Sequence, residues 1–236
     1  MDKLVLDKRD SSGLLAIGDN KPNVVLVAGN NDINLLLQYA ALDVKSREER
    51  CIYSVSTFNE FDKEDAAKIL KYMQDDKIAK KMFYDFLASM SSSDNDVIVK
   101  SDGEIIVGDR HEDFSYSSLD DIGEWFKYLF EIALKVFIVS DGIVIVNNIN
   151  LNIGIDTYRK LFFYISKMAA YRNNTVIIAT DCITAVKGLS AFVAKNDDFM
   201  TTLVTIKGNN ASNCKIFEIA ESEHKVTSDL LASLSA

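Results

Sequence analysis

Short, continuous apolar runs of strand length are the feature that most constrains the fold of this chain. They lie at residues 23–28, 143–146 and 175–179, and 51–55 is a further candidate strand. Runs without polar alternation are typical of strands that are covered on both faces, as in a parallel sheet. The chain is therefore expected to build its core around a mostly parallel sheet.

The segments between these runs have the three-four spacing of apolar residues that predicts amphipathic helices. Strands that alternate with helices indicate βαβ units and an α/β fold. The predicted helices cover residues 35–44, 64–90 with a break near 75–76, 124–137 and 156–171.

Two further patterns predict antiparallel pairing. Residues 96–107 carry β-rich runs on either side of Asp102-Gly103, which is typical of a hairpin. The β-rich segments 200–206 and 214–219 are joined by a loop containing Gly208-Asn209-Asn210, which indicates antiparallel strands at one edge of the sheet. With no repeat or linker evident, residues 1–236 are expected to form a single domain.

The charge balance argues against nucleic acid as the main partner. Net charge is −9, from 26 Lys and Arg against 35 Asp and Glu. Affinity for DNA depends largely on neutralising its phosphates. The basic residues between 68 and 81 alternate with acidic ones, which is typical of a solvated helix face.

The cysteines and the apolar runs indicate the compartment. Cys51, Cys182 and Cys214 are odd in number and far apart, which favours reduced thiols over a zinc site. No apolar run is long enough to cross a membrane, and the N-terminus lacks the apolar stretch of a secretory signal. We therefore expect a cytoplasmic protein without membrane insertion.

Four loops follow predicted strands, at 29–34, 56–60, 147–154 and 180–182. Parallel sheets bind ligands at the edge where such loops meet. Yet Gly29-Asn30-Asn31-Asp32-Ile33-Asn34 lacks the Lys and the Ser or Thr with which a P-loop holds phosphate and Mg²⁺. Asp32 would also repel a triphosphate. By composition alone, Gly29 marks a strand–helix turn.

The loop after the run at 143–146 begins with Asn147 and Asn148. An amide is a weaker ligand for Mg²⁺ than a carboxylate and cannot act as a general base. The plain interpretation is that both asparagines satisfy backbone groups at a strand end. Neither loop therefore carries the residues of a working phosphoryl-transfer site.

The order of these segments resembles that of RecA- and KaiC-like P-loop ATPases over roughly residues 4 to 220. Leu6-Asp7-Lys8-Arg9 and Ser12-Gly13-Leu14 are similar to the stretch LDxxLGGGIPxG that leads into the P-loop strand of that family. The segments 36–40, 49–57 and 175–180 resemble its LALQFA, EKCLYVSTEE and TVLLTxH motifs. The resemblance implies a three-layer αβα fold with a mostly parallel central sheet.

The same resemblance implies a pseudo-ATPase. The P-loop Lys and Thr are absent, and the loop is shorter by about three residues than the GxxxxGK[ST] pattern requires. The catalytic glutamates of the family correspond to Phe58 and Asn59, and its Walker B Asp corresponds to Asn147. Because each of these groups contributes to phosphoryl transfer, their joint loss predicts no hydrolysis, no catalytic residue, no metal and no cofactor.

Residues 118–180 also resemble the C-terminal half of ABC/OLD-type ATPases. Ile122-Gly123-Glu124-Trp125 is similar to their LGDG-like signature, and Asn147-Asn148 replaces their Asp-Glu pair. This rival resemblance implies the same fold class and the same loss of catalytic residues.

The leading hypothesis is an assembly, scaffold or regulatory subunit that binds copies of itself or a related active ATPase. Three alternatives remain open at this point. They are a nucleotide sensor without hydrolysis, a DNA-repair accessory resembling RadA paralogues, and an enzyme with relocated chemistry at Asp181 and Cys182 or at 109–113.

Overall fold

The structure is a computed structural model that places most of the central part of the chain. The residues that it describes are 5–6, 15–16, 24–28, 52–56, 63–90, 95–100, 103–109, 116–147, 149, 151–180, 182–193, 201–206 and 214–218.

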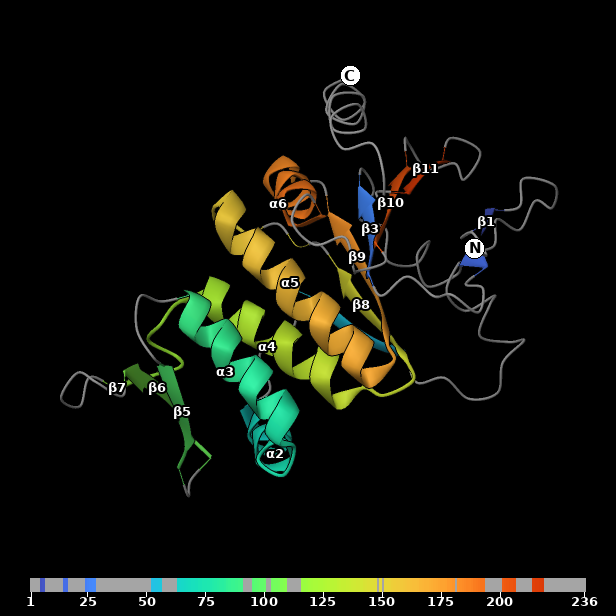
Figure 1. The fold of residues 1–236 in the computed structure, drawn as a ribbon. Helices are drawn as coiled ribbons and strands as arrows, with labels where there is room; N and C mark the ends of the chain where they lie inside the picture. Colours follow the sequence, from blue (N-terminus) through green and yellow to red (C-terminus); the bar gives the residue numbers. More distant parts are fainter. Residues whose placement is uncertain are drawn as a thin grey trace.

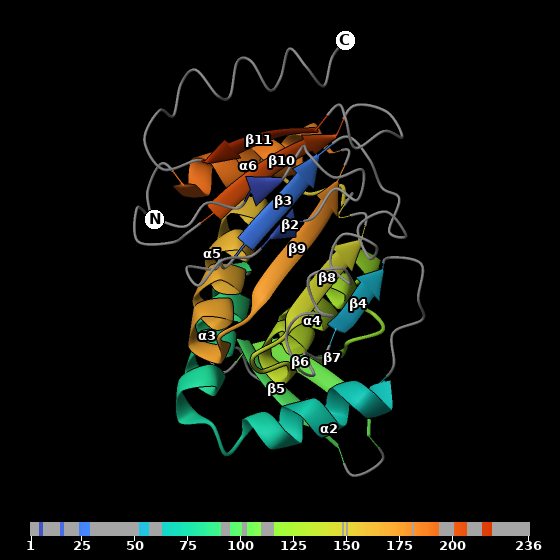
Figure 2. The ribbon, with the colours of Figure 1, turned by 90° about the vertical axis from the view of Figure 1, so that its right-hand side faces the viewer.

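A six-stranded, mostly parallel sheet forms the centre of the described fold (Figure 1). Five strands run parallel to one another, and the sixth, β11 (Cys214–Glu218), pairs antiparallel with β10 (Thr201–Ile206) at one edge (Figure 2). This confirms the predicted α/β class and the antiparallel strand at the C-terminal end. In spatial order, the strands are β11 (Cys214–Glu218), β10 (Thr201–Ile206), β3 (Val24–Ala28), β9 (Thr175–Thr180), β8 (Ile143–Asn147) and β4 (Ile52–Ser56).

Burial explains the apolar runs. Every residue of β9 is buried, and Val144, Ile145 and Val146 of β8 are fully so. Strands of this kind have no solvent-facing side, so polar alternation would place polar groups in the core without partners.

The helices that the structure describes form two layers on one face of the sheet (Figure 1). The inner layer contains α4 (Glu124–Ile138), α5 (Ile155–Arg172) and α6 (Ile183–Val193). The outer layer contains α2 (Lys63–Met73), which contacts α4, and α3 (Lys77–Met90), which contacts α5. The helix predicted at 35–44 lies outside the described residues.

The break between α2 and α3 is where the sequence predicted it. The Asp76 carboxylate accepts hydrogen bonds from the amides of Ile78 (3.1 Å) and Ala79 (2.9 Å), and so caps the N-terminus of α3. The Tyr171 hydroxyl, at the far end of α5, donates to the same carboxylate (3.1 Å). One side chain thus starts α3 and ties it to α5.

The predicted hairpin is present and belongs to a separate three-stranded antiparallel sheet. Its strands are β5 (Asn95–Val99), β6 (Ile105–Asp109) and β7 (Tyr116–Ser118). Gly103 in the turn has φ of 86°, a conformation that glycine adopts without strain. A two-stranded sheet pairs β1 (Val5–Leu6) with β2 (Leu15–Ala16).

The Asn174 amide is one of the polar side chains buried among the described residues. Asn174, 2 % exposed, donates to the carbonyls of Val136 (3.0 Å) and Val139 (2.9 Å) and accepts from the amide of Gly142 (3.1 Å). It thereby joins the end of α4 to the segments that enter β8 and β9. A buried amide with all these partners satisfied fixes one arrangement of the three segments.

Candidate functional site

The carboxyl ends of the parallel strands meet at one edge of the sheet. The register pairs Ala28 of β3 with Thr180 of β9, and Ser56 of β4 with Asn147 of β8. The loops that the sequence singled out therefore leave from the same edge. The parallel pattern in the sequence predicted this shared edge, but it did not predict which strands are neighbours.

The direction of the chain changes at β3. After β3 the chain passes to β4, the outermost strand on one side of the sheet. After β9 it passes in the opposite direction, to β10 on the other side of β3. In open α/β sheets, ligands bind where neighbouring strands send their connections in opposite directions. The candidate site is therefore at the end of β3, immediately before Gly29.

Most of the predicted site residues lie outside the described part of the chain. This applies to the first loop, to the positions that follow β4 and to the second asparagine after β8. Asn147 is described as the last residue of β8, with its backbone opposite Ser56. The residues outside are Gly29, Asn30, Asn31, Asp32, Asn34, Phe58, Asn59 and Asn148.

The loop after β8 is held by a buried tyrosine that the sequence indicated only as one member of an apolar stripe. The Tyr158 hydroxyl accepts a hydrogen bond from the amide of Leu151 (2.9 Å). It also lies within donating distance of two carbonyls, those of Ile149 (3.1 Å) and Leu151 (2.9 Å). Tyr158 is fully buried, and burial raises the pKa of its hydroxyl well above the usual range. It therefore stays protonated and serves as a structural donor and acceptor.

The end of β9 holds the same loop from the other side. The Thr180 hydroxyl donates to the carbonyl of Ile149 (3.3 Å) and accepts from the amide of Cys182 (2.9 Å). The amide of Ile149 donates to the carbonyl of Ala179 (3.1 Å). The chain after Asn147 thus returns toward β9 and is tied to it, so these loop groups are satisfied within the protein.

The groups proposed for relocated chemistry are only partly placed. Cys182 is half-buried, and its Sγ lies 3.8 Å from the Tyr158 hydroxyl. That neighbour is a neutral phenol, which does not activate a thiol as a base would. Asp109 ends β6, whereas Asp181, residues 110–113 and both histidines lie outside the described residues.

The described residues offer neither a metal-binding cluster nor a membrane-spanning helix. Within these ranges, His, Cys, Asp and Glu side chains do not gather in groups of three that could hold a metal ion. Among the helices that the structure describes, none combines the length and apolar character needed to cross a membrane.

Comparison with known proteins gives no family. No protein-family model matches the sequence, and no curated protein matches it. A solved structure with partial similarity is the Smc head domain of Pyrococcus furiosus, with an extended coiled coil, bound to the C-terminal domain of ScpA. The TM-score is 0.41 at 10 % identity, and the match covers 86 % of this chain and 46 % of that chain. The present chain thus spans less than half the length of the protein it matches.

Proposed function

We propose that this protein is a RecA/KaiC-like ATPase homologue that has lost catalysis and acts as an assembly or regulatory subunit through protein–protein contacts. The observation that carries the proposal is the position of Asn147. It ends β8 at the ligand-binding edge of a parallel sheet, where the proposed family places the metal-binding Asp. A neutral amide there neither holds Mg²⁺ firmly nor takes a proton.

The strand order supports the proposed relationship. One strand, β9, separates the strand that precedes Gly29 from the strand that ends at Asn147. The carboxyl ends of β3 and β8 therefore lie at the same edge of the sheet. A site that holds a nucleotide at the end of β3 and a metal ion at the end of β8 would require this arrangement. The finer assignment, a three-layer P-loop fold with helices on both faces, is part of this proposal.

The hydrogen bonds of the loop after β8 also support it. A catalytic loop keeps polar groups available for metal, water or substrate, whereas the described groups of Ile149 and Leu151 bond to Tyr158, Thr180 and β9. Loss of the carboxylate, together with hydrogen bonds within the protein for these loop groups, is what we expect of a protein that keeps the fold without the catalysis.

Phosphate release tests the catalytic half of the proposal. The purified chain and an Asn147→Ala variant are incubated with Mg-ATP. We expect neither to release phosphate above a protein-free blank, because the cation, the metal ligand and the base are missing from the sequence. Release by the wild-type chain that the variant loses would contradict the proposal. A rise in melting temperature with ATP but no release would favour the sensor alternative instead.

Stoichiometry tests the assembly half. The tagged chain is recovered from its own cells at native expression level, and its mass is measured by light scattering. We expect either a defined homo-oligomer or a complex of fixed ratio with an active ATPase. A monomer without any partner at fixed ratio would contradict this role.

A further inference from the structure

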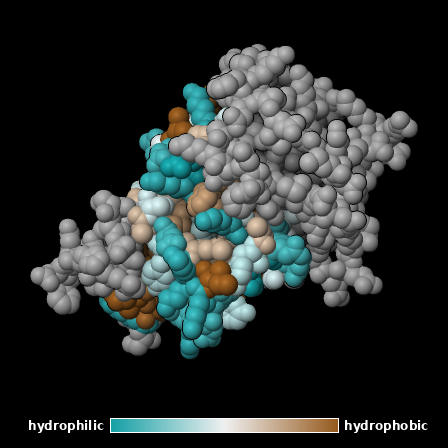
Figure 3. All heavy atoms as spheres, in the orientation of Figure 1, coloured by the Kyte–Doolittle hydropathy of each residue, from teal (hydrophilic) through white to brown (hydrophobic). Residues whose placement is uncertain are grey.

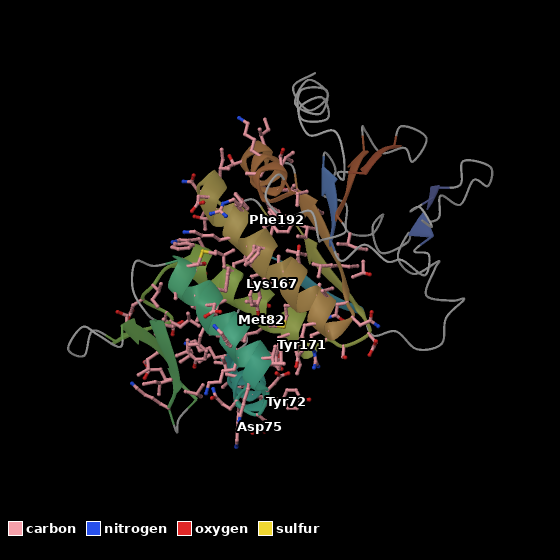
Figure 4. The ribbon with its side chains drawn as sticks, viewed as in Figure 1. Tyr72, Asp75, Met82, Lys167, Tyr171 and Phe192 are labelled. Carbon is pink, nitrogen blue, oxygen red and sulfur yellow. The ribbon has the colours of Figure 1, made fainter. Side chains whose placement is uncertain are left out.

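A hollow of about 360 Å³ lies between α3 and α5, on the helical face away from the sheet. Its walls are visible in Figure 4, where Met82 marks α3 and Lys167 marks α5. Figure 3 shows hydrophilic side chains on this face surrounding smaller areas of hydrophobic atoms. The volume falls in the range of small-molecule sites, about 300–1,000 Å³.

The apolar part of the hollow is preformed. Phe86 of α3 and Tyr164 of α5 both line it, and their rings stack with centroids 4.6 Å apart. The Tyr164 hydroxyl donates to the carbonyl of Ala133 (3.0 Å), which fixes the ring against α4. Both rings are almost fully buried, so only their edges reach the hollow, but their fixed packing means that this wall needs no rearrangement to receive a ligand.

The polar part is cationic. Arg159, Lys160 and Lys167 line the hollow, against one carboxylate, Asp85, which is engaged by Lys81 (2.9 Å). This excess of positive charge stands out in a chain whose net charge is −9.

The three cations differ in their partners. Arg159 donates to Asp156 (2.6 Å), and Lys160 binds the same carboxylate (3.0 Å) and the carbonyl of Ser89 (2.7 Å). The Lys167 ammonium instead lies 4.2 Å from the centre of the Phe163 ring, and within the described residues it forms no ion pair. A cation at the edge of an apolar hollow, without a carboxylate of its own, is suited to an incoming anion.

We propose that the hollow between α3 and α5 binds a small amphipathic anion, with an acyl or aryl body and one carboxylate-type head. The body lies against Met82 and Phe163 above the Phe86–Tyr164 ring pair, and the head binds Lys167. A neutral molecule of the same shape gains only the apolar contacts. A hydrogen bond to a charged group contributes about 1.5–3 kcal/mol, which corresponds to at least about tenfold in affinity.

Calorimetric titration with decanoate, below its micelle concentration, tests this directly. We expect saturable binding at one site, and binding at least about tenfold weaker for the neutral analogue decan-1-ol. Lys167→Gln should weaken decanoate binding by a similar factor and leave decanol binding unchanged. Lys187→Gln removes the same charge from an exposed position on α6 outside the hollow, and should bind decanoate like the wild type.

A further variant keeps the test independent of the Lys167 substitution. Met82→Trp should weaken the binding of decanoate and of decanol together by filling the hollow. Each variant is compared with wild type by circular dichroism before titration. No saturable binding of decanoate, equal binding of decanol, or equal losses in Lys167→Gln and Lys187→Gln would overturn the proposal. None of these outcomes depends on whether the protein is an ATPase homologue that has lost catalysis.

Discussion

Gly188 of α6 packs so closely on α5 that a Cβ atom at position 188 would lie 2.3 Å from the Cβ of Tyr158. The same added atom would lie 3.2 Å from the carbonyl oxygen of Ile155. Glycine is therefore required at this helix crossing for lack of space, even though it weakens the interior of a helix. The crossing also holds Tyr158, whose hydroxyl organises the loop after β8.

Gly188→Ala should consequently destabilise the protein. Overpacking of this kind costs about 1–3 kcal/mol, and the displaced atoms belong to a helix backbone and a Cβ, which cannot swing aside. Replacing glycine with alanine in a helix adds about 1 kcal/mol of stability through helix propensity. A clash that costs less than this would therefore not lower the measured stability. Denaturant unfolding measures the difference, with Lys187→Ala as a neighbouring exposed control expected within about 0.5 kcal/mol of wild type. A stabilised Gly188→Ala variant would show that the helices do not approach this closely.

Tyr158→Phe should cost more stability than Tyr164→Phe. Both hydroxyls are buried, but that of Tyr158 serves a backbone amide and a carbonyl of one loop, whereas that of Tyr164 serves the single carbonyl of Ala133. Removing a partner from a buried backbone group costs about 1–3 kcal/mol for each group left unsatisfied. Denaturant midpoints of the two variants give the comparison, and an equal or reversed order would contradict the assigned role of Tyr158.

The local elements of this fold are accessible from sequence because each has a local cause. The continuous run of β9 reflects burial on both faces, and the break before α3 reflects a capping aspartate. The order of the strands is different, because it depends on which distant segments pair. No local pattern states that β9 lies between β3 and β8.

Two features, helix α6 and the role of Tyr158, could not be predicted from the sequence for physical reasons. Helix α6 contains Gly188 and two β-branched residues at its start, Ile183 and Thr184, which weaken the helical pattern until its packing on Tyr158 is known. The role of Tyr158 depends on where its hydroxyl points, which an apolar stripe does not indicate. Its presence in that stripe was still a usable signal, because a buried tyrosine hydroxyl requires a partner.

Asn174→Ala should be among the most destabilising single substitutions in the inner layer. It leaves the carbonyl of Val136 and the amide of Gly142 without their side-chain partner in the core, whereas the carbonyl of Val139 still accepts from Arg172 Nε (3.3 Å). With about 1–3 kcal/mol for each buried group left unsatisfied, we expect a loss of at least about 2 kcal/mol. Asn152→Ala, at an exposed position, is the control and should unfold at the wild-type midpoint. Equal midpoints for both variants would contradict the structural role of Asn174.

Alkaline pH should destabilise the protein through its buried tyrosines. Burial raises the pKa of Tyr164 well above the usual range, and burial raises that of Tyr158 despite the opposing hydrogen bond from Leu151. Above a pH of about 10 the unfolded chain releases these two protons while the folded chain keeps them. The unfolded state then binds fewer protons, so the free energy of unfolding falls as pH rises, by about 1.4 kcal/mol per pH unit for each tyrosine.

Denaturant unfolding at a series of alkaline pH values, with tyrosinate absorbance followed in parallel, measures this dependence. Tyr164→Phe is the informative variant, because burial is the only cause of the shift at that position. It should reduce the slope of stability against pH by about 1.4 kcal/mol per unit relative to wild type, and lysine titration cancels in the comparison. Identical slopes in the two proteins, or full tyrosine ionisation before unfolding, would mean that Tyr164 is not held protonated in the core.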